Sequence, residues 1–258
     1  MKSVTEAPQL EGSVAVIVGG GPGISSSCAR LFSANGMRVA VAARTPDKAP
    51  MKLLEQELGV NCYACDAANP QDVARLFSAV TSDLGTPRLV VHNIDGRTLD
   101  IIRKDFVEAE AEAVRGVLMN SPFSAFLVAQ QAVQAMLADP AGEGQPNGTI
   151  VFSNASAAIK GYPRSAAFAM ACHAKAGLTE SMARELMPHG IHVAHVPIDG
   201  AIGWVQEDGS RWHRLAGTTE QDNMLHPDYI AQTYLQIHTQ HRSTWTNEVV
   251  LRPWVENW

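Results

Sequence analysis

Cysteine is scarce in this sequence, and long apolar runs are missing from it. The four cysteines, in a chain of 258 residues, are too few for the disulfide framework of a small secreted protein. The apolar run 14–18 is far too short to span a bilayer, which takes about 20 residues. The first residues lack the charged and then apolar pattern of a signal peptide. We therefore expect a cytoplasmic protein with no membrane partner.

Positive charge is also in short supply. Lysine and arginine number 20 against 26 acidic residues, which gives a formal net charge of −6. Such a chain offers no basic surface for a phosphate backbone, so we expect no nucleic-acid partner. With 46% hydrophobic and 18% charged residues, the composition is that of a compact protein with a sizeable core.

A recognisable metal site is the third feature that the sequence lacks. Cys62 and Cys65 have the spacing of a zinc or redox pair, but no second pair and no cluster of histidines accompanies them. Because this pair falls on an expected strand, we interpret it as structural and expect no metal.

Short apolar runs alternate with stretches of helical periodicity along the chain. The expected strands lie at 14–18, 39–43, 60–64, 89–92, 149–153, 192–196 and 248–251. The expected helices lie at 23–35, 50–58, 70–84, 105–138, 165–188 and 227–239. This alternation predicts one α/β domain over residues 1–258, a doubly wound parallel sheet of Rossmann type.

The stretch 200–226 is irregular and follows the sixth expected strand. Ligands of open α/β sheets lie outside the carboxyl ends of the strands, so this stretch is a candidate substrate lid. Trp204 and Trp212 fall in it, where aromatic faces suit a flat or cationic organic molecule. The remaining tryptophans are expected to pack a subunit interface or cover the sheet; they are Trp245, Trp254 and Trp258.

Glycines follow the first expected strand where a helix begins. The turn has the sequence Gly19-Gly20-Gly21-Pro22-Gly23-Ile24. Such a turn lets the backbone approach a pyrophosphate, while the helix N-terminus offers unpaired N–H groups and a favourable dipole. Its place between a strand and a helix predicts a dinucleotide site made by Gly19, Gly21, Gly23 and Ile24.

The end of the second expected strand indicates which dinucleotide binds. Proteins that bind NAD usually carry an acidic residue there, which holds the ribose 2′-hydroxyl. This sequence has Arg44 and Thr45 instead. A guanidinium pairs with a 2′-phosphate through charge-assisted hydrogen bonds, so we expect NADP(H) as the cofactor.

These residues together resemble the short-chain dehydrogenase/reductase superfamily over about residues 12–251. The glycine turn resembles its nucleotide turn, and residues 177–193 resemble its long central helix and the strand after it. Further likenesses imply cofactor contacts by Asp66 and Ala67 with the adenine, by Asn93 in a degraded Asn-Asn-Ala-Gly segment, and by Gly200 and Ile202 with the nicotinamide. The resemblance also implies a homodimer or homotetramer.

The sequence departs from this superfamily where its chemistry is done. Its members use a tyrosine that exchanges a proton with the substrate oxygen, a lysine four residues later, and a serine. Ungapped alignment of residues 150–186 puts Phe168, Cys172 and Ala155 at those three positions. Because Phe168 cannot exchange a proton, the usual alcohol and ketone chemistry has no evident route. The resemblance therefore implies the fold and the cofactor but does not supply the reaction.

Polar residues nearby are candidates for the missing roles. Ser156 adjoins the serine position and either binds a ligand or bonds to nearby backbone. Lys175 lies on the helical stripe of Phe168, roughly 4.5 Å beyond the lysine position, and either reaches the site or only packs. Asp199 either acts as acid, base or partner of a cationic substrate, or caps its own turn. Cys172 is a nucleophile or a core residue, and Tyr162 offers a phenol or only lines the pocket.

Three functions fit this pattern. The first is an NADPH-dependent reductase of an iminium ion or a conjugated system, in which no tyrosine acid is needed, as in atypical members of natural-product pathways that couple imine reduction to cyclisation. The second is a non-redox cyclase, isomerase or lyase on the same fold. The third is a catalytically silent NADP(H)-binding protein.

Overall fold

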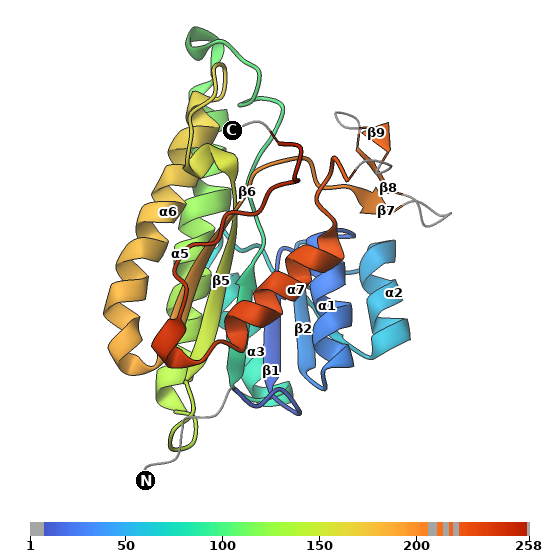
Figure 1. The fold of residues 1–258 in the computed structure, drawn as a ribbon, viewed down its shortest axis with the longest axis vertical. Coiled ribbons are helices and arrows are strands. Elements are labelled where there is room, and N and C mark those ends of the chain that lie inside the picture. The colour runs from blue at the N-terminus through green and yellow to red at the C-terminus, as the bar shows by residue number, and fades with distance from the viewer. Residues whose placement is uncertain (1–7, 206–210, 214–216, 219–221, 257–258) are drawn as a thin grey trace.

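A six-stranded parallel sheet organises the chain, which a computed structural model describes for residues 8–205, 211–213, 217–218 and 222–256 (Figure 1). The strand order is β3-β2-β1-β4-β5-β6. The strands are β1 (Val14–Val18), β2 (Arg38–Ala43), β3 (Asn61–Ala64), β4 (Pro87–His92), β5 (Gly148–Ala155) and β6 (Ile191–Ile198). Since the order reverses between β1 and β4, the predicted doubly wound α/β fold is confirmed.

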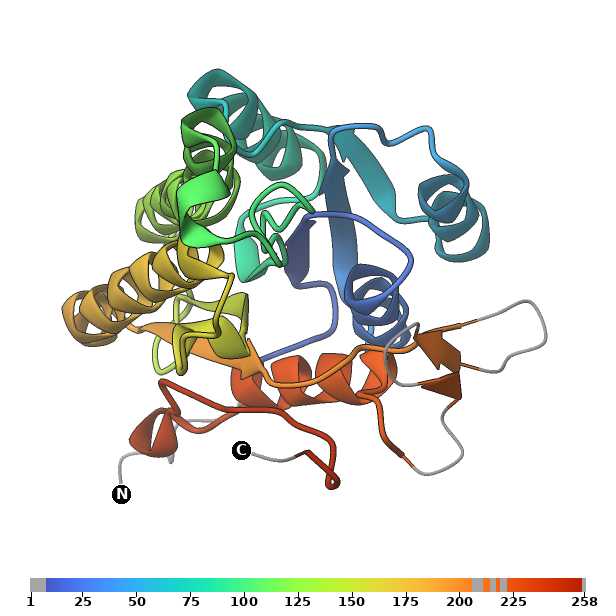
Figure 2. The ribbon, with the colours of Figure 1, turned by 90° about the horizontal axis from the view of Figure 1, so that it is seen from above.

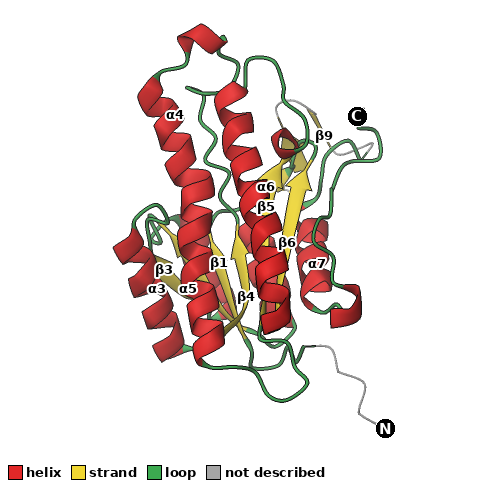
Figure 3. Ribbon diagram, turned by 90° about the vertical axis from the view of Figure 1, so that its left-hand side faces the viewer, coloured by secondary structure: helices red, strands yellow, loops and turns green. Residues whose placement is uncertain are grey.

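Helices cover both faces of this sheet (Figures 2 and 3). Alternate residues of β1 belong to different cores: Val16 packs in one, and Ile17 packs in the other. The helices on the Val16 side are α3 (Pro70–Asp83), α5 (Ser124–Ala138) and α6 (Ala166–Leu186). Those on the Ile17 side are α1 (Ile24–Ala34), α2 (Ala49–Leu58) and α7 (Pro227–His238).

The single helix predicted at 105–138 is wrong. The chain instead forms η1 (Phe106–Glu108), α4 (Ala111–Leu118), the π-helical turn η2 (Met119–Phe123) and α5. Glu110 has extended backbone, with φ −70° and ψ 132°, which separates η1 from α4. Pro122 lies inside the π turn, and because it has no N–H it cannot make the ordinary helical bond to the residue four positions earlier.

The strand predicted at 248–251 is present only as isolated bridges to β6. His195 pairs with Glu248 and Ile198 pairs with Leu251, both in parallel. His195 and Asp199 donate their backbone N–H groups to this segment, to Asn247 and Leu251, each at 2.7 Å. Pro197 lies midway between these two donors and has no N–H, so the ladder is interrupted there.

The predicted lid contains a small antiparallel sheet in its described part. Its strands are β7 (Trp204–Val205), β8 (Arg211–His213) and β9 (Gly217–Thr218). Residues 206–210, 214–216 and 219–221 lie outside the described residues, as do the side chains of Trp204 and Trp212 and all of Trp258. Among the helices that the structure describes, none is both long and apolar enough to cross a membrane.

Trp245 covers the outer side of β6. It follows η5 (Arg242–Thr244), and its ring stacks on His192 with the ring centroids 4.8 Å apart. Trp254, in contrast, is 79% exposed. The sequence predicted that these tryptophans pack a subunit interface or cover the sheet. The position of Trp245 fits the second role.

A buried hydrogen bond joins α7 to β5 and gives a test of this packing. Tyr234 is fully buried, and its hydroxyl lies 2.6 Å from the Ser153 hydroxyl. Tyr234→Phe leaves the Ser153 hydroxyl without this partner, so we expect the free energy of unfolding to fall by about 1–2 kcal/mol in urea denaturation. The matched variant Tyr229→Phe removes a hydroxyl from an exposed tyrosine of the same helix and should cost less than about 0.5 kcal/mol. Equal effects of the two variants would contradict this packing.

Candidate functional site

The turn after β1 is held by close backbone contacts. Gly19 has a φ of +104°, and a Cβ there would lie 2.5 Å from the carbonyl oxygen of Asn93. The N–H groups of Gly19 and Gly20 both donate to the carbonyl of Ala42, at 3.0 and 2.9 Å. Only glycine fits at position 19, because this backbone conformation and this approach both exclude a side chain. The turn is thereby fixed against β2 and the end of β4.

Side chains of α1 and β4 support the same turn. The Ser25 hydroxyl donates to the carbonyl of Gly19 at 2.7 Å, and the amide of Asn93 donates to that hydroxyl at 2.9 Å. Ser26 donates to the carbonyl of Gly21 at 2.8 Å. These bonds occupy the carbonyl groups of Gly19 and Gly21. The start of α1 therefore presents backbone N–H groups, rather than these carbonyl groups, to a ligand.

The N-terminus of α1 fits an anionic group. Its N-cap is Gly23, no side chain caps the helix, and no acidic residue lies in its first turn. A Cβ on Gly21 or Gly23 would meet no atom within 4 Å, so open space lies in front of both residues. Uncapped N–H groups, the helix dipole and this space together suit the pyrophosphate of a dinucleotide.

A cavity of about 1080 Å³ extends from this turn along the carboxyl ends of the strands. Its wall includes much of the site predicted from the sequence: Gly19, Gly21, Gly23, Ile24, Asn93, Ser156, Asp199, Gly200 and Ile202. Strand ends far apart in the chain thus meet at one edge of the sheet, as the fold predicts. The structure therefore brings the glycine turn and the candidate catalytic loop into one space.

Other predicted cofactor residues lie away from the wall of this cavity. Arg44 and Thr45 directly follow β2 and are exposed. The Asp66 carboxylate accepts the N–H of Ala68 at 3.0 Å, and Ala67 is buried in the core. The cofactor contacts of Arg44, Thr45 and Asp66 therefore stay predictions, whereas the side chain of Ala67 packs inward, away from any cofactor.

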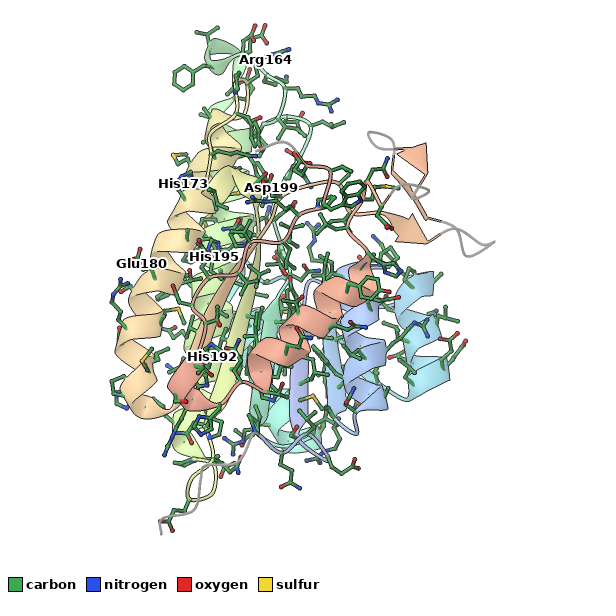
Figure 4. The ribbon with its side chains drawn as sticks, viewed as in Figure 1. Arg164, His173, Glu180, His192, His195 and Asp199 are labelled. Carbon is green, nitrogen blue, oxygen red and sulfur yellow. The ribbon has the colours of Figure 1, made fainter. Side chains whose placement is uncertain are left out.

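Asp199 is enclosed by positive charge. It follows β6 (Figure 4). Its exposed fraction is 2%. Its Oδ2 lies 3.2 Å from Nζ of Lys160 and 3.6 Å from Nε of Arg252. Through these two ion pairs, Asp199 joins the loop after β5 to the C-terminal segment. Because Lys160 and Arg252 already compensate the negative charge of this carboxylate, it attracts a cationic ligand only weakly.

Comparisons with known proteins agree with this architecture. Residues 19–246 match the family model described as enoyl-(acyl carrier protein) reductase. Zerumbone synthase from Zingiber zerumbet is 31% identical over 192 residues, which cover 72% of this chain and 67% of that protein. The chain belongs to the short-chain dehydrogenase/reductase superfamily.

Two other relatives match this chain over only part of their own length. Short chain aldehyde dehydrogenase 1 from Euphorbia lathyris is 28% identical over 75% of this chain, and tropinone reductase-like 1 from Erythroxylum coca is 30% identical over 72% of it. The chain spans 65% and 66% of these two relatives, just under two thirds of their length.

Solved structures of the superfamily match almost the whole chain. A short-chain dehydrogenase from Rhodopseudomonas palustris has a TM-score of 0.75 at 26% identity, covering 95% of this chain and 100% of that one. A metagenomic short-chain oxidoreductase, solved in complex with NADP, has a TM-score of 0.74 at 22% identity and covers 95% and 99% of the two chains. At 22% identity, this second match shows a shared fold and nothing further.

Ala155, Phe168 and Cys172 are the residues that the sequence alignment predicts at the superfamily's serine, tyrosine and lysine positions, and the structure shows where each of them lies. Ala155 and Phe168 line the cavity, and the guanidinium carbon of Arg97 lies 5.4 Å from the centroid of the Phe168 ring. Cys172 is fully buried, and burial raises the pKa of its thiol to about 11. The thiol therefore stays protonated at neutral pH, which fits the core residue rather than the nucleophile.

Several cavity residues were missed by reasoning from the sequence. Arg97 and Arg103 line the cavity and come from the irregular stretch after β4. Asn154 donates its amide to the carbonyl of Cys172 at 2.9 Å and approaches Nε2 of His195 at 2.8 Å. The position of Asn154 at the end of a buried strand was the available signal, since a polar residue there needs buried partners.

Lys175 does not reach the cavity wall. It is fully buried, and its Nζ donates to the carbonyl oxygens of Ile94 and Ser153, at 2.5 and 3.2 Å. Burial lowers the pKa of this ammonium to about 8. Lys175 therefore joins the segment after β4 to β5. The sequence suggested either an ammonium in water or a direct contact with substrate, and the buried position of Lys175 matches neither.

The low pKa of Lys175 makes stability depend on pH in a defined window. Between about pH 8 and 10.5 the unfolded chain holds a proton on Lys175 that the folded chain has lost. The free energy of unfolding therefore rises with pH across this window, and this stabilisation is lost as the pH falls through 8. Relative to Lys175→Met, the wild-type protein should gain about 3 kcal/mol in urea denaturation series.

A control variant separates this effect from general alkaline changes. Lys52→Met removes an exposed lysine of α2 and should follow the wild-type curve across the same pH range. Parallel curves for the wild-type protein and Lys175→Met would show that Lys175 keeps its ordinary pKa in the folded state.

Proposed function

We propose that this chain is an NADP(H)-dependent reductase of a small organic molecule whose acceptor is an iminium ion or a conjugated double bond. The observation that carries the proposal is the combination of two features in one cavity. The glycine turn and the open N-terminus of α1 are complete, whereas Phe168 occupies the position aligned with the superfamily's tyrosine. A reductase with this wall must act on a group that does not need a proton from position 168.

The residues present fit the cofactor. The N–H groups of the first turn of α1, facing the space in front of Gly21 and Gly23, would hold the pyrophosphate. Arg44 would pair with the 2′-phosphate from the exposed end of β2, and Asp66 would contact the adenine. Gly200 and Ile202 line the cavity and would meet the nicotinamide. When bound, the reduced nicotinamide supplies a hydride.

The surroundings of Asp199 favour the conjugated acceptor over the iminium ion. The carboxylate expected to attract a cationic substrate is already paired with Lys160 and Arg252. Arg103 also lines the cavity, and its positive charge suits the enolate that follows hydride addition to a conjugated carbonyl, whereas Arg97 is itself paired with Asp95 at 3.1 Å. The description of the matching family model, an enoyl reductase, supports the same choice.

Turnover assays with model acceptors test this proposal. We expect NADPH absorbance to fall when the protein is mixed with cyclohexenone, a conjugated ketone, and to fall less or not at all with the cyclic imine pyrroline. Turnover of an added compound with unchanged nucleotide would instead support the non-redox cyclase, isomerase or lyase. Nucleotide binding without any turnover would support the silent binding protein and contradict the reductase.

The cofactor assignment has its own variant. Arg44→Gln removes a charge-assisted hydrogen bond to the 2′-phosphate, so we expect the Kd for NADPH in calorimetry to rise about tenfold or more, with the Kd for NADH unchanged. Arg115→Gln removes an exposed arginine of α4 and serves as the matched control. An equal loss of affinity for NADPH and NADH in Arg44→Gln would contradict a contact between Arg44 and the 2′-phosphate. The homodimer or homotetramer and the cytoplasmic location stay predictions.

A further inference from the structure

The loop after β5 gathers three polar side chains at the cavity. The short helix η3 (Ser156–Ala158) turns the chain sharply, and the N–H groups of Ile159 and Lys160 both donate to the carbonyl of Ser156, at 2.9 and 3.0 Å. This turn brings the Tyr162 hydroxyl to 3.2 Å from the Ser156 hydroxyl. Ser156 and Tyr162 both line the cavity, and Tyr162 is 42% exposed.

Lys160, on the same loop, connects this cluster to Asp199 after β6. Its Nζ lies 5.5 Å from the centroid of the Tyr162 ring and 3.2 Å from Oδ2 of Asp199. The buried Asp199 fixes the direction of the Lys160 side chain, and Lys160 in turn lies beside the phenol. A hydroxyl, a phenol, an ammonium and a carboxylate therefore follow one another beside the cavity, and Ser156, Tyr162 and Asp199 line its wall.

We propose that Tyr162 is the proton donor of this cavity, held in place by Ser156 and Lys160, and that it serves the oxygen of a conjugated carbonyl. The proposal rests on the reductase function and deepens it by naming the substrate class. An iminium acceptor would need no such donor, because hydride addition to it gives a neutral amine. The position of the phenol, six residues before Phe168 and on a loop rather than a helix, is not one that the alignment assigns to catalysis.

The proton step balances within this cluster. The substrate carbon accepts a hydride with its electron pair from the reduced nicotinamide required by the proposed function, and the negative charge moves to the substrate oxygen. The O–H bond of Tyr162 breaks as an O–H bond forms on that oxygen, and the phenolate is left beside Lys160. Lys160 then gives a proton to the phenolate and takes one from solvent, to which its side chain is 33% exposed.

The electrostatics of Lys160 suit this role. The neighbouring Tyr162, and then the Asp199 carboxylate, raise the pKa of Lys160 above its ordinary value. The ammonium therefore keeps its charge at neutral pH and stabilises a phenolate next to it. Lys160 is a positioning residue in this account, since it acts on the substrate only through Tyr162.

A pair of phenylalanine variants tests the donor. With cyclohexenone and NADPH, Tyr162→Phe should lower kcat/KM by about a hundredfold or more, because general acid catalysis contributes that much. Turnover of pyrroline, where the wild-type protein shows any, should be unchanged, and so should NADPH binding. Tyr229→Phe, at a 64% exposed tyrosine of α7, is the matched control. Wild-type turnover of cyclohexenone by Tyr162→Phe would overturn the proposal.

A labelling experiment tests the cluster without any substrate. Phenylsulfonyl fluoride reacts with phenols activated by a neighbouring cation, and peptide mass spectrometry follows each tyrosine separately. We expect Tyr162 to be labelled about tenfold faster than Tyr229, this advantage to vanish in Lys160→Met, and Lys160→Arg to restore it. Equal labelling of Tyr162 and Tyr229 in the wild-type protein would overturn the proposal.

The two experiments distinguish failure of the inference from failure of the proposed function. If no acceptor is reduced by the wild-type protein but Tyr162 is labelled fast and depends on Lys160, the reductase function is wrong and the activated phenol stands. If cyclohexenone is reduced equally by the wild-type protein and Tyr162→Phe, the reductase stands and the assignment of Tyr162 is wrong. Circular dichroism of each variant checks that it has folded.

Discussion

The close approach of the Gly19 backbone to Asn93 is the constraint on which the candidate site depends. A side chain at position 19 would collide with the carbonyl of Asn93, and the N–H groups of Gly19 and Gly20 share one acceptor on β2. The Ser25 hydroxyl then donates to the carbonyl of Gly19 and accepts from the amide of Asn93. With these groups occupied, the uncapped N-terminus of α1 lies at the cavity wall, where we propose that it receives an anionic cofactor.

The side of the cavity formed by α6 fits the proposed departure from the superfamily's usual chemistry. Phe168 makes this side of the cavity wall apolar, Cys172 is fully buried, and the Lys175 ammonium donates to the carbonyls of Ile94 and Ser153. Charge and hydroxyl groups are found instead on the loop after β5 and at the end of β6. Since loops tolerate change better than packed helices, a reaction can be altered there without loss of the sheet.

The sequence alone was enough for the parts of the structure that depend on local pattern. Alternating apolar runs predicted the sheet, and the glycine turn predicted the N-terminus of α1 at the cavity. It was not enough where a single residue removes a hydrogen bond: Pro122 opens a π turn inside a predicted helix, and Pro197 interrupts the last strand pairing. Helical spacing put Lys175 on the same stripe of α6 as Phe168, but its buried ammonium depends on the carbonyl groups of Ile94, just after β4, and of Ser153, on β5. The contact of Lys160 with Asp199 joins residues 39 positions apart, so only the folded chain shows it.

We propose that the N-terminus of α1 receives the phosphates of NADPH. Backbone hydrogen exchange of Gly21 and residues 23–25, followed by NMR with and without NADPH, checks this at the amides concerned. We expect these amides to exchange markedly more slowly when NADPH is bound, while those of α2 and α3 are little changed. If their exchange is unaltered under conditions where NADPH is bound, the nucleotide lies elsewhere on the protein.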